Sequence, residues 1–295
     1  MRLLLFSLFT PLVLAEIPVS YTPSGTRIFS VPKGSHLRQS GSDLNVVAED
    51  GSISHVFENL MRGRPDRGPT KRQSLSVPVD ATTSLPDNST ILSFNSTLVV
   101  PPLPTTFNSQ IMFFTYGVLF DDDGELFLSA GLQYGGTEFQ GGPYWTLTIM
   151  SESVPQNLFL QSYLGNPIVH PGDVLNMSIS VSPISEFGLS GLWEYTLGFN
   201  NDPDLTVSQV FQSPAPTSLL FRAQEEGVSQ ASDYPAGSVL FQDVSLVFNT
   251  TTGPSTASVS WTTDTNSTVQ PGLEIQVDGN DSQVSQIAIV FPDST

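Results

Sequence analysis

The carboxylates whose spacing could do chemistry are Asp121, Asp123 and Glu125, which alternate along one short stretch of the chain. Alternate positions on a strand share a face, and glycoside hydrolysis needs two carboxylates about 5–10 Å apart. Gly124 interrupts this stretch, however, and Asp-Gly is typical of a tight hairpin turn. We therefore interpret these acids as turn residues, with a surface Ca²⁺ site as the alternative. Other carboxylates, such as Glu152, have no partner at a suitable spacing.

The composition gives little support for catalysis or metal binding by cysteine or histidine side chains. The chain contains no cysteine, which excludes a thiol nucleophile and a thiolate metal site. His170 is the one histidine after residue 72, and it directly precedes the turn sequence Pro171-Gly172-Asp173. We interpret it as a turn residue rather than a catalytic base. We expect no cofactor and no bound metal.

A candidate binding groove lies in the stretch 118–145. Two apolar segments flank the Asp-Gly turn, and a glycine-rich loop, 135–142, leads into the next strand. Long polar and aromatic side chains beside glycines suit a groove that stacks on a sugar or a peptide. The alternative is that the aromatic rings belong to the core. The candidate groove residues are Gln133, Tyr134, Tyr144 and Trp145.

The elements that must position these residues are short strands. Gly and Pro number 23 each and only 13% of the residues are charged, which favours many turns. No segment after residue 20 keeps a helical periodicity, so we predict two packed antiparallel sheets. The expected strands are 91–100, 110–120, 125–134, 143–150, 157–163, 173–182, 192–199, 205–212, 217–224, 238–248, 257–262, 272–277 and 284–291.

The N-terminal region has the pattern of a processed precursor. Residues 1–15 resemble a secretory signal with cleavage after Ala15, and residues 16–72 form a basic propeptide. The propeptide ends in Lys71-Arg72, a dibasic processing site; the alternative is an extension that stays attached. A Ser/Thr/Pro-rich linker, 73–87, then precedes one β-sandwich domain, 88–295.

Charge and sequons complete the picture of a secreted acidic glycoprotein. Residues 1–72 hold nine of the ten Lys and Arg but six of the 28 acids, so the remainder is strongly acidic. Such a chain should repel nucleic acid and anionic membranes, and we expect a monomer, extracellular or in the cell wall. With a signal peptide, the sequons predict glycosylation. They are Asn88, Asn95, Asn176, Asn249, Asn266 and Asn280.

Five segments of the chain carry a resemblance to a known family. They are Leu98–Pro102, Glu125–Leu132, Tyr144-Trp145, Ile168–Val174 and Ser232–Phe241. These segments resemble the eqolisins, secreted fungal glutamic peptidases, and they follow the family's order. The resemblance implies a concanavalin A-like lectin/glucanase β-sandwich, and it leads us to predict an all-β, two-sheet antiparallel β-sandwich of the eqolisin-like type.

The resemblance also implies a site that this chain departs from. In eqolisins a glutamate activates water as a general base, and a glutamine stabilises the tetrahedral intermediate. The alignment places Ser129 at the glutamine and Gln224 at the glutamate, and an amide cannot act as a base. A shift of one residue would bring in Glu225, but neighbours on a strand point to opposite faces. Gln133, on the face of Ser129, and Glu138 are the remaining candidates.

These departures favour a protein that has kept an eqolisin-like groove without its catalytic pair. We predict that it binds polysaccharide or peptide and is not an enzyme. The first alternative is an acid-active endopeptidase of the glutamic type, which would use Glu225, or Gln133 with Glu138. The second alternative is a structural protein of the cell wall or matrix.

Overall fold

The computed structural model describes most of the chain between residues 20 and 292. The described ranges are 20–23, 25–60, 79–119, 126–136, 141–153, 158–184, 191–212, 216–256, 259–264, 273–278 and 285–292. Several residues singled out above fall outside them: Ala15, Lys71, Arg72, Asp121, Asp123, Glu125, Glu138, Asn266 and Asn280. No helix within the described ranges has the length and apolar character needed to cross a bilayer.

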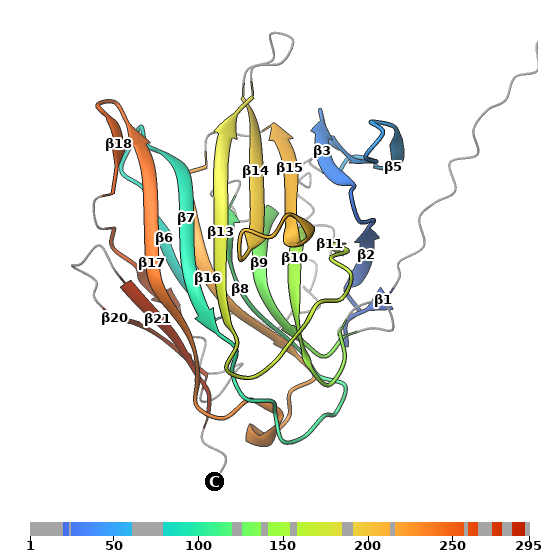
Figure 1. The fold of residues 1–295 in the computed structure, drawn as a ribbon, viewed down its shortest axis with the longest axis vertical. Coiled ribbons are helices and arrows are strands. Elements are labelled where there is room, and N and C mark those ends of the chain that lie inside the picture. Colours follow the sequence, from blue (N-terminus) through green and yellow to red (C-terminus); the bar gives the residue numbers. More distant parts are fainter. Residues whose placement is uncertain are drawn as a thin grey trace, which may run out of the picture.

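Two large sheets face each other, which confirms the predicted all-β sandwich (Figure 1). The first, sheet A, has the order β1-β2-β11-β10-β9-β8-β16-β6-β19, with β12 paired to β10. Its strands are β1 (Ser20–Tyr21), β2 (Arg27–Val31), β11 (Leu158–Ser162), β10 (Trp145–Ser153), β9 (Leu126–Tyr134), β8 (Ile111–Leu119), β16 (Ser218–Glu226), β6 (Val79–Ser84), β19 (Thr262–Asp264) and β12 (Ile168–Val169).

The second, sheet B, has the order β20-β21-β17-β7-β13-β14-β15-β3-β4-β5, with β18 paired to β17. Two short 3-10 helices, η1 (Pro203–Leu205) and η2 (Ala231–Asp233), lie in its connections. Its strands are β20 (Glu274–Asp278), β21 (Ser285–Val290), β17 (Ser238–Thr250), β7 (Thr90–Val99), β13 (Val174–Pro183), β14 (Leu192–Phe199), β15 (Thr206–Gln212), β3 (His36–Ser40), β4 (Asp43–Val47), β5 (Ile53–Phe57) and β18 (Gly253–Ser255).

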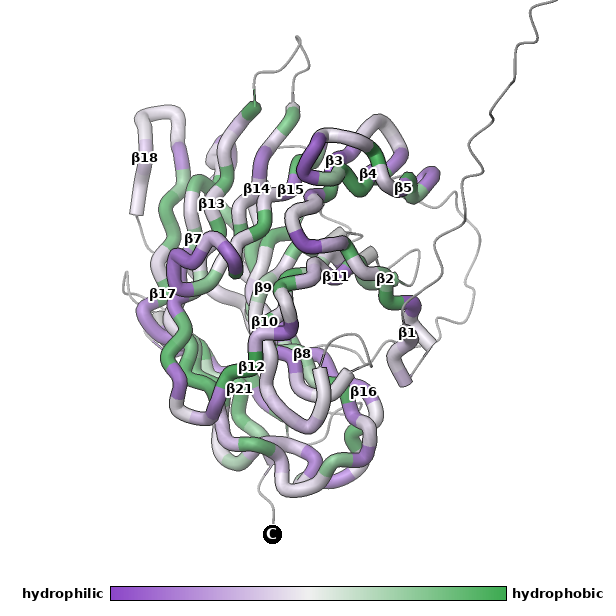
Figure 2. Tube along the Cα trace, turned by 45° about the vertical axis from the view of Figure 1, so that its right-hand side comes forward, coloured by the Kyte–Doolittle hydropathy of each residue, from purple (hydrophilic) through white to green (hydrophobic). Residues whose placement is uncertain are grey.

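Alternation of apolar and polar residues places one face of each strand in the core between the sheets. On β9, Leu128, Ala130 and Leu132 join this core, so that Ser129 and Gln133 point away from sheet B. On β17, buried and less buried positions alternate in the same way, and hydrophobic and hydrophilic residues follow one another along the strand (Figure 2). The polar positions of β9 are therefore presented on the side of sheet A that faces away from sheet B.

Two segments contribute more to the sheets than the sequence indicated. β6 lies inside 73–87, the segment expected to be a linker, and it pairs antiparallel with β16 over its whole length. Strands from the expected propeptide join both sheets, and they make the two parallel contacts, β2 with β11 and β3 with β15. The remaining strand pairs are antiparallel in the described part of the chain, so the prediction of purely antiparallel sheets was wrong at these two edges.

Candidate functional site on the outer face of sheet A

The outer face of sheet A, meaning the side chains that point away from sheet B, carries an unusual set of polar groups. Strands β8, β9, β10, β11 and β16 lie side by side, and alternate residues of each contribute to this face. Phe113 of β8 is the register partner of both Gln133 and Gln224, so this ring separates the two amides. The buried polar or charged residues of the outer face include Thr115, Ser129, Gln133, Thr146, Thr148, Glu152, Gln161, Gln224 and Glu226, and the side chain of Arg222 is 13% exposed.

Gln133 is held by a cluster of hydrogen bonds. Gln161 Nε2 donates to Gln133 Oε1 at 2.5 Å and to Thr148 Oγ1 at 2.8 Å. Gln133 Nε2 in turn donates to the backbone carbonyl of Gly135 at 3.0 Å. Gln133, a candidate groove residue and the candidate amide of the peptidase alternative, is therefore fixed in orientation by Gly135 and by Gln161 of β11.

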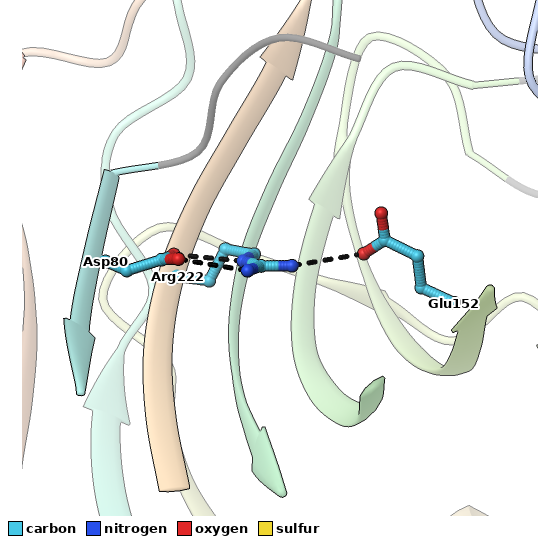
Figure 3. Close-up of polar contacts among 3 residues, drawn as sticks. All are labelled: Asp80, Glu152 and Arg222. Carbon is cyan, nitrogen blue, oxygen red and sulfur yellow. Dashed lines mark hydrogen bonds and ion pairs between the residues drawn. The ribbon is translucent and has the colours of Figure 1, made fainter. Parts of the chain in front are cut away.

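The charged centre of the outer face is Arg222, which joins three strands (Figure 3). Its Nε and Nη2 both donate to the carboxylate of Asp80 at 2.9 Å, a bidentate contact between β16 and β6. Its Nη1 lies 3.3 Å from Glu152 Oε2 on β10. The guanidinium also lies 4.8 Å from the ring centroid of Phe127. The Arg222 guanidinium therefore forms ion pairs with two carboxylates, those of Asp80 and Glu152.

Glu152 is the carboxylate of this face that lies beside an amide. Burial raises the pKa of the Glu152 carboxyl; Arg222 opposes that shift and Asp80 adds to it. The Gln224 side chain hydrogen-bonds to Glu152 as well. The sequence analysis found no partner for Glu152, because its partners lie on strands far away in the sequence. The signal that could have found it is Arg222, the one Lys or Arg after residue 72, which directly follows the apolar run Leu219-Leu220-Phe221.

Three oxygens of the outer face are buried without a hydrogen-bond partner in the described structure. They are Thr115 Oγ1, Ser129 Oγ and Gln224 Oε1. The side chains of these residues are 0%, 0% and 2% exposed, respectively. A buried polar atom without a partner costs about 1–3 kcal/mol. These acceptors would therefore gain from donors supplied by a buried water, or by a ligand once the groups that cover them move aside.

The candidate Glu225 lies on the opposite side of sheet A. Residues at alternate positions of β16 lie on the same face of the sheet, so Glu225 faces the same way as Phe221 and Ala223. Those two residues belong to the core between the sheets. Burial raises the pKa of Glu225 to about 7, against the hydrogen bond with Tyr234 that lowers it. Gln133 and Glu225 therefore face opposite ways, and they form no pair around a common water.

Two of the three aromatic residues predicted to line the groove, Tyr134 and Trp145, belong to the core instead. Tyr134 and Trp145 pack against each other in the core, with ring centroids 5.2 Å apart, because their parity is opposite to that of Gln133. Tyr144 is half-buried, and its hydroxyl donates to the carbonyl of Gly141 at 2.9 Å. Five apolar residues that do lie on the outer face form a small cluster of their own. They are Ile28, Ile111, Phe113, Met150 and Phe159.

His170 lies at a turn that precedes β13. The backbone N–H of His170 donates to Asp173 Oδ2 at 2.8 Å, as expected for a turn residue. No group of three or more His, Asp or Glu side chains within the described ranges is arranged to hold a metal ion.

The sequons within the described ranges lie on the other sheet or in a loop. Asn176 on β13 and Asn249 on β17 are exposed, and Asn95 on β7 is half-buried. All three have the parity that points away from the core, on the outer face of sheet B. Asn88 is exposed in the connection between β6 and β7.

Comparison with known proteins gives matches among solved structures. No family model matches the chain, and no curated protein matches it. A crystal structure of Scytalido-glutamic peptidase with a peptide-based transition-state analogue aligns at 18% identity, with a TM-score of 0.43. The structure of SCP-B, a member of the eqolisin family, in complex with the tripeptide Ala-Ile-His aligns at 15% identity, with a TM-score of 0.40. Each alignment covers 73% of this chain and 98% of the other.

Proposed function

We propose that this protein is a secreted, acidic glycoprotein that binds an extended polysaccharide or peptide on the outer face of sheet A without hydrolysing it. The observation that carries the proposal is the set of three unpartnered acceptor oxygens on Thr115, Ser129 and Gln224. Sugar hydroxyls and peptide N–H groups are donors of the matching kind.

The charged network argues against hydrolysis at this face. A general base needs a carboxylate that can accept a proton from a positioned water. The Glu152 carboxylate is engaged by Arg222 and by Gln224, and Arg222 is itself shared with Asp80. Burial raises the pKa of Glu225 to about 7, but its side chain faces the core and not the outer face of sheet A. We therefore assign the network the role of fixing three strands of the binding face.

A second candidate function is an acid peptidase, favoured by the hydrogen bond between Gln224 and Glu152. In this mechanism Glu152 takes a proton from water, and the oxygen of that water adds to the scissile carbonyl. The Gln224 amide stabilises the oxyanion, and protonated Glu152 returns its proton to the leaving amine. The base would then lie on β10, and the amide would lie at Gln224, where the eqolisin resemblance places the glutamate.

The first experiment separates the two functions. The purified protein is incubated with denatured casein in acid, beside the variants Glu152→Gln and Glu225→Gln. We expect no cleavage by the folded wild-type protein. Cleavage that disappears in Glu152→Gln and persists in Glu225→Gln would establish the peptidase and overturn the binding-only proposal.

The second experiment tests binding with isosteric variants. Soluble glycans and peptides of denatured casein are screened against the wild type, Ser129→Ala and Thr115→Val. We expect about a five- to tenfold loss of affinity in each variant, because each removes one acceptor worth about 1 kcal/mol. Ser180→Ala, on the exposed side of sheet B, is the matched control and should bind as the wild type does. Failure of every glycan and peptide to bind would favour a structural wall or matrix protein.

A further inference from the structure

The segment 20–57 covers the same edge of both sheets. β2 runs parallel to the edge strand β11 over five residue pairs, and the N–H of Tyr163 donates to the carbonyl of Val31 at 2.9 Å. β3 then meets β15 of sheet B and leads into the β3-β4-β5 meander. Figure 1 shows these strands together at one side of the sandwich, next to β15 and β11. The segment therefore extends both sheets rather than crossing over a face of either.

Apolar side chains of the segment belong to the main core. These residues are at most 5% exposed and pack in one continuous cluster with the strands of both sheets, so their removal would open that core to water. They are Phe29, Val31, Leu37, Leu44 and Val46.

Polar contacts also cross the boundary between the segment and the rest of the chain. Gln39 Oε1 accepts from the N–H of Gln212 at 3.0 Å, next to the contact between β3 and β15. Lys33 Nζ lies 3.0 Å from Asp204 Oδ1, although this pair is exposed and contributes little. Residues 20–57 contain three Lys or Arg and three Asp or Glu, so the segment carries no net charge. The association therefore depends on backbone pairing and apolar packing.

We propose that residues 20–57 are a permanent part of the fold. When the chain is cut after Arg72, the N-terminal piece stays bound, and the protein becomes two chains held together without a covalent link. Release would expose the long edges of β11 and β15 to water and to other strands, which proteins avoid because such edges promote aggregation. The proposal concerns stability and assembly, so it is independent of what the outer face of sheet A binds.

The test uses the full secreted chain with residues 66–72 replaced by the recognition sequence of a site-specific viral protease. The cut is verified on a denaturing gel, and the sample is then analysed by native mass spectrometry and size exclusion, with and without added salt. We expect both pieces at the mass of the uncut protein, and we expect this at high salt too. An N-terminal piece that leaves a remainder with unchanged circular dichroism would overturn the proposal.

Matched variants identify the contacts that hold the piece. Leu37→Asp and Ser40→Asp lie on the same strand, but Leu37 is fully buried and Ser40 is exposed. After the cut, we expect the N-terminal piece to dissociate in Leu37→Asp and to stay bound in Ser40→Asp. If Leu37→Asp is not secreted, Val31→Ala serves as a milder change in the same core. Equal retention in the buried and exposed variants would contradict a role of the core contacts.

Discussion

Arg222 is the residue on which the charge balance of the outer face of sheet A depends. It is largely buried, and it neutralises Asp80 through two hydrogen bonds and Glu152 through a third contact. Replacing a buried ion network with apolar side chains can be neutral, but the removal of one partner leaves a charge without compensation. Arg222 therefore supports the face without necessarily touching a ligand.

We expect Arg222→Met to lower the free energy of unfolding by about 3–5 kcal/mol at neutral pH. Without Arg222, the pKa of Glu152 rises further above its value in the unfolded chain, because burial then acts without an opposing charge. The loss should therefore shrink as the pH falls and Glu152 becomes protonated. Denaturant unfolding at neutral and acidic pH measures this. The double variant Arg222→Met, Glu152→Gln should recover part of the loss, and no recovery would argue against the ion network.

At the scale of the elements, the close contact between β8 and β9 depends on glycine. A Cβ atom on Gly131 would lie 2.1 Å from the carbonyl oxygen of Phe114 and 2.7 Å from Thr115 Cα, so the two strands would have to separate. We expect Gly131→Ala to cost more than about 2 kcal/mol of unfolding free energy. Ser129→Ala, on the same face of β9, should be neutral or slightly stabilising, because its hydroxyl has no partner. Thermal unfolding of the two variants side by side tests this contrast.

The strands themselves could be predicted from the sequence because alternation and turn residues are local signals. β7, β8, β9, β13, β14 and β17 lie close to the predicted ranges. The site could be predicted only in part. Gln133 and Tyr134 are neighbours on β9 and must face opposite ways, so they could not both line one groove. The partnership of Glu152 with Arg222 depends on the register of β10, β9, β8 and β16, which no local pattern encodes.

At the scale of the whole molecule, we expect an acidic pH to stabilise the fold. The chain has a formal net charge of −18, and its self-repulsion fades as carboxylates take up protons. Burial raises the pKa of Glu225 to about 7 from its ordinary 4.5, so the folded state binds more protons than the unfolded state between these values. Glu225 therefore makes its full contribution to the free energy of unfolding below pH 4.5, and this contribution is lost as the pH rises towards 7.

We therefore expect the free energy of unfolding to fall as the pH rises from about 4.5 to 7. Glu225→Gln should remove up to about 3 kcal/mol of this fall, since one pKa unit corresponds to about 1.4 kcal/mol. Urea unfolding across this pH range is the measurement. A thermal midpoint that drops steadily from neutral pH to pH 4 would show that the carboxyl groups act in the opposite sense.

The placement of the sequons has a consequence for how the protein would sit on a polymer. Asn95, Asn176 and Asn249 point outward from sheet B, and no sequon within the described ranges lies on the outer face of sheet A. Glycans attached there would cover the outer face of sheet B and leave the outer face of sheet A free of carbohydrate. A protein bound to a wall or fibre through the outer face of sheet A would turn its glycans towards the surroundings. Many copies side by side would coat that fibre with a layer of carbohydrate.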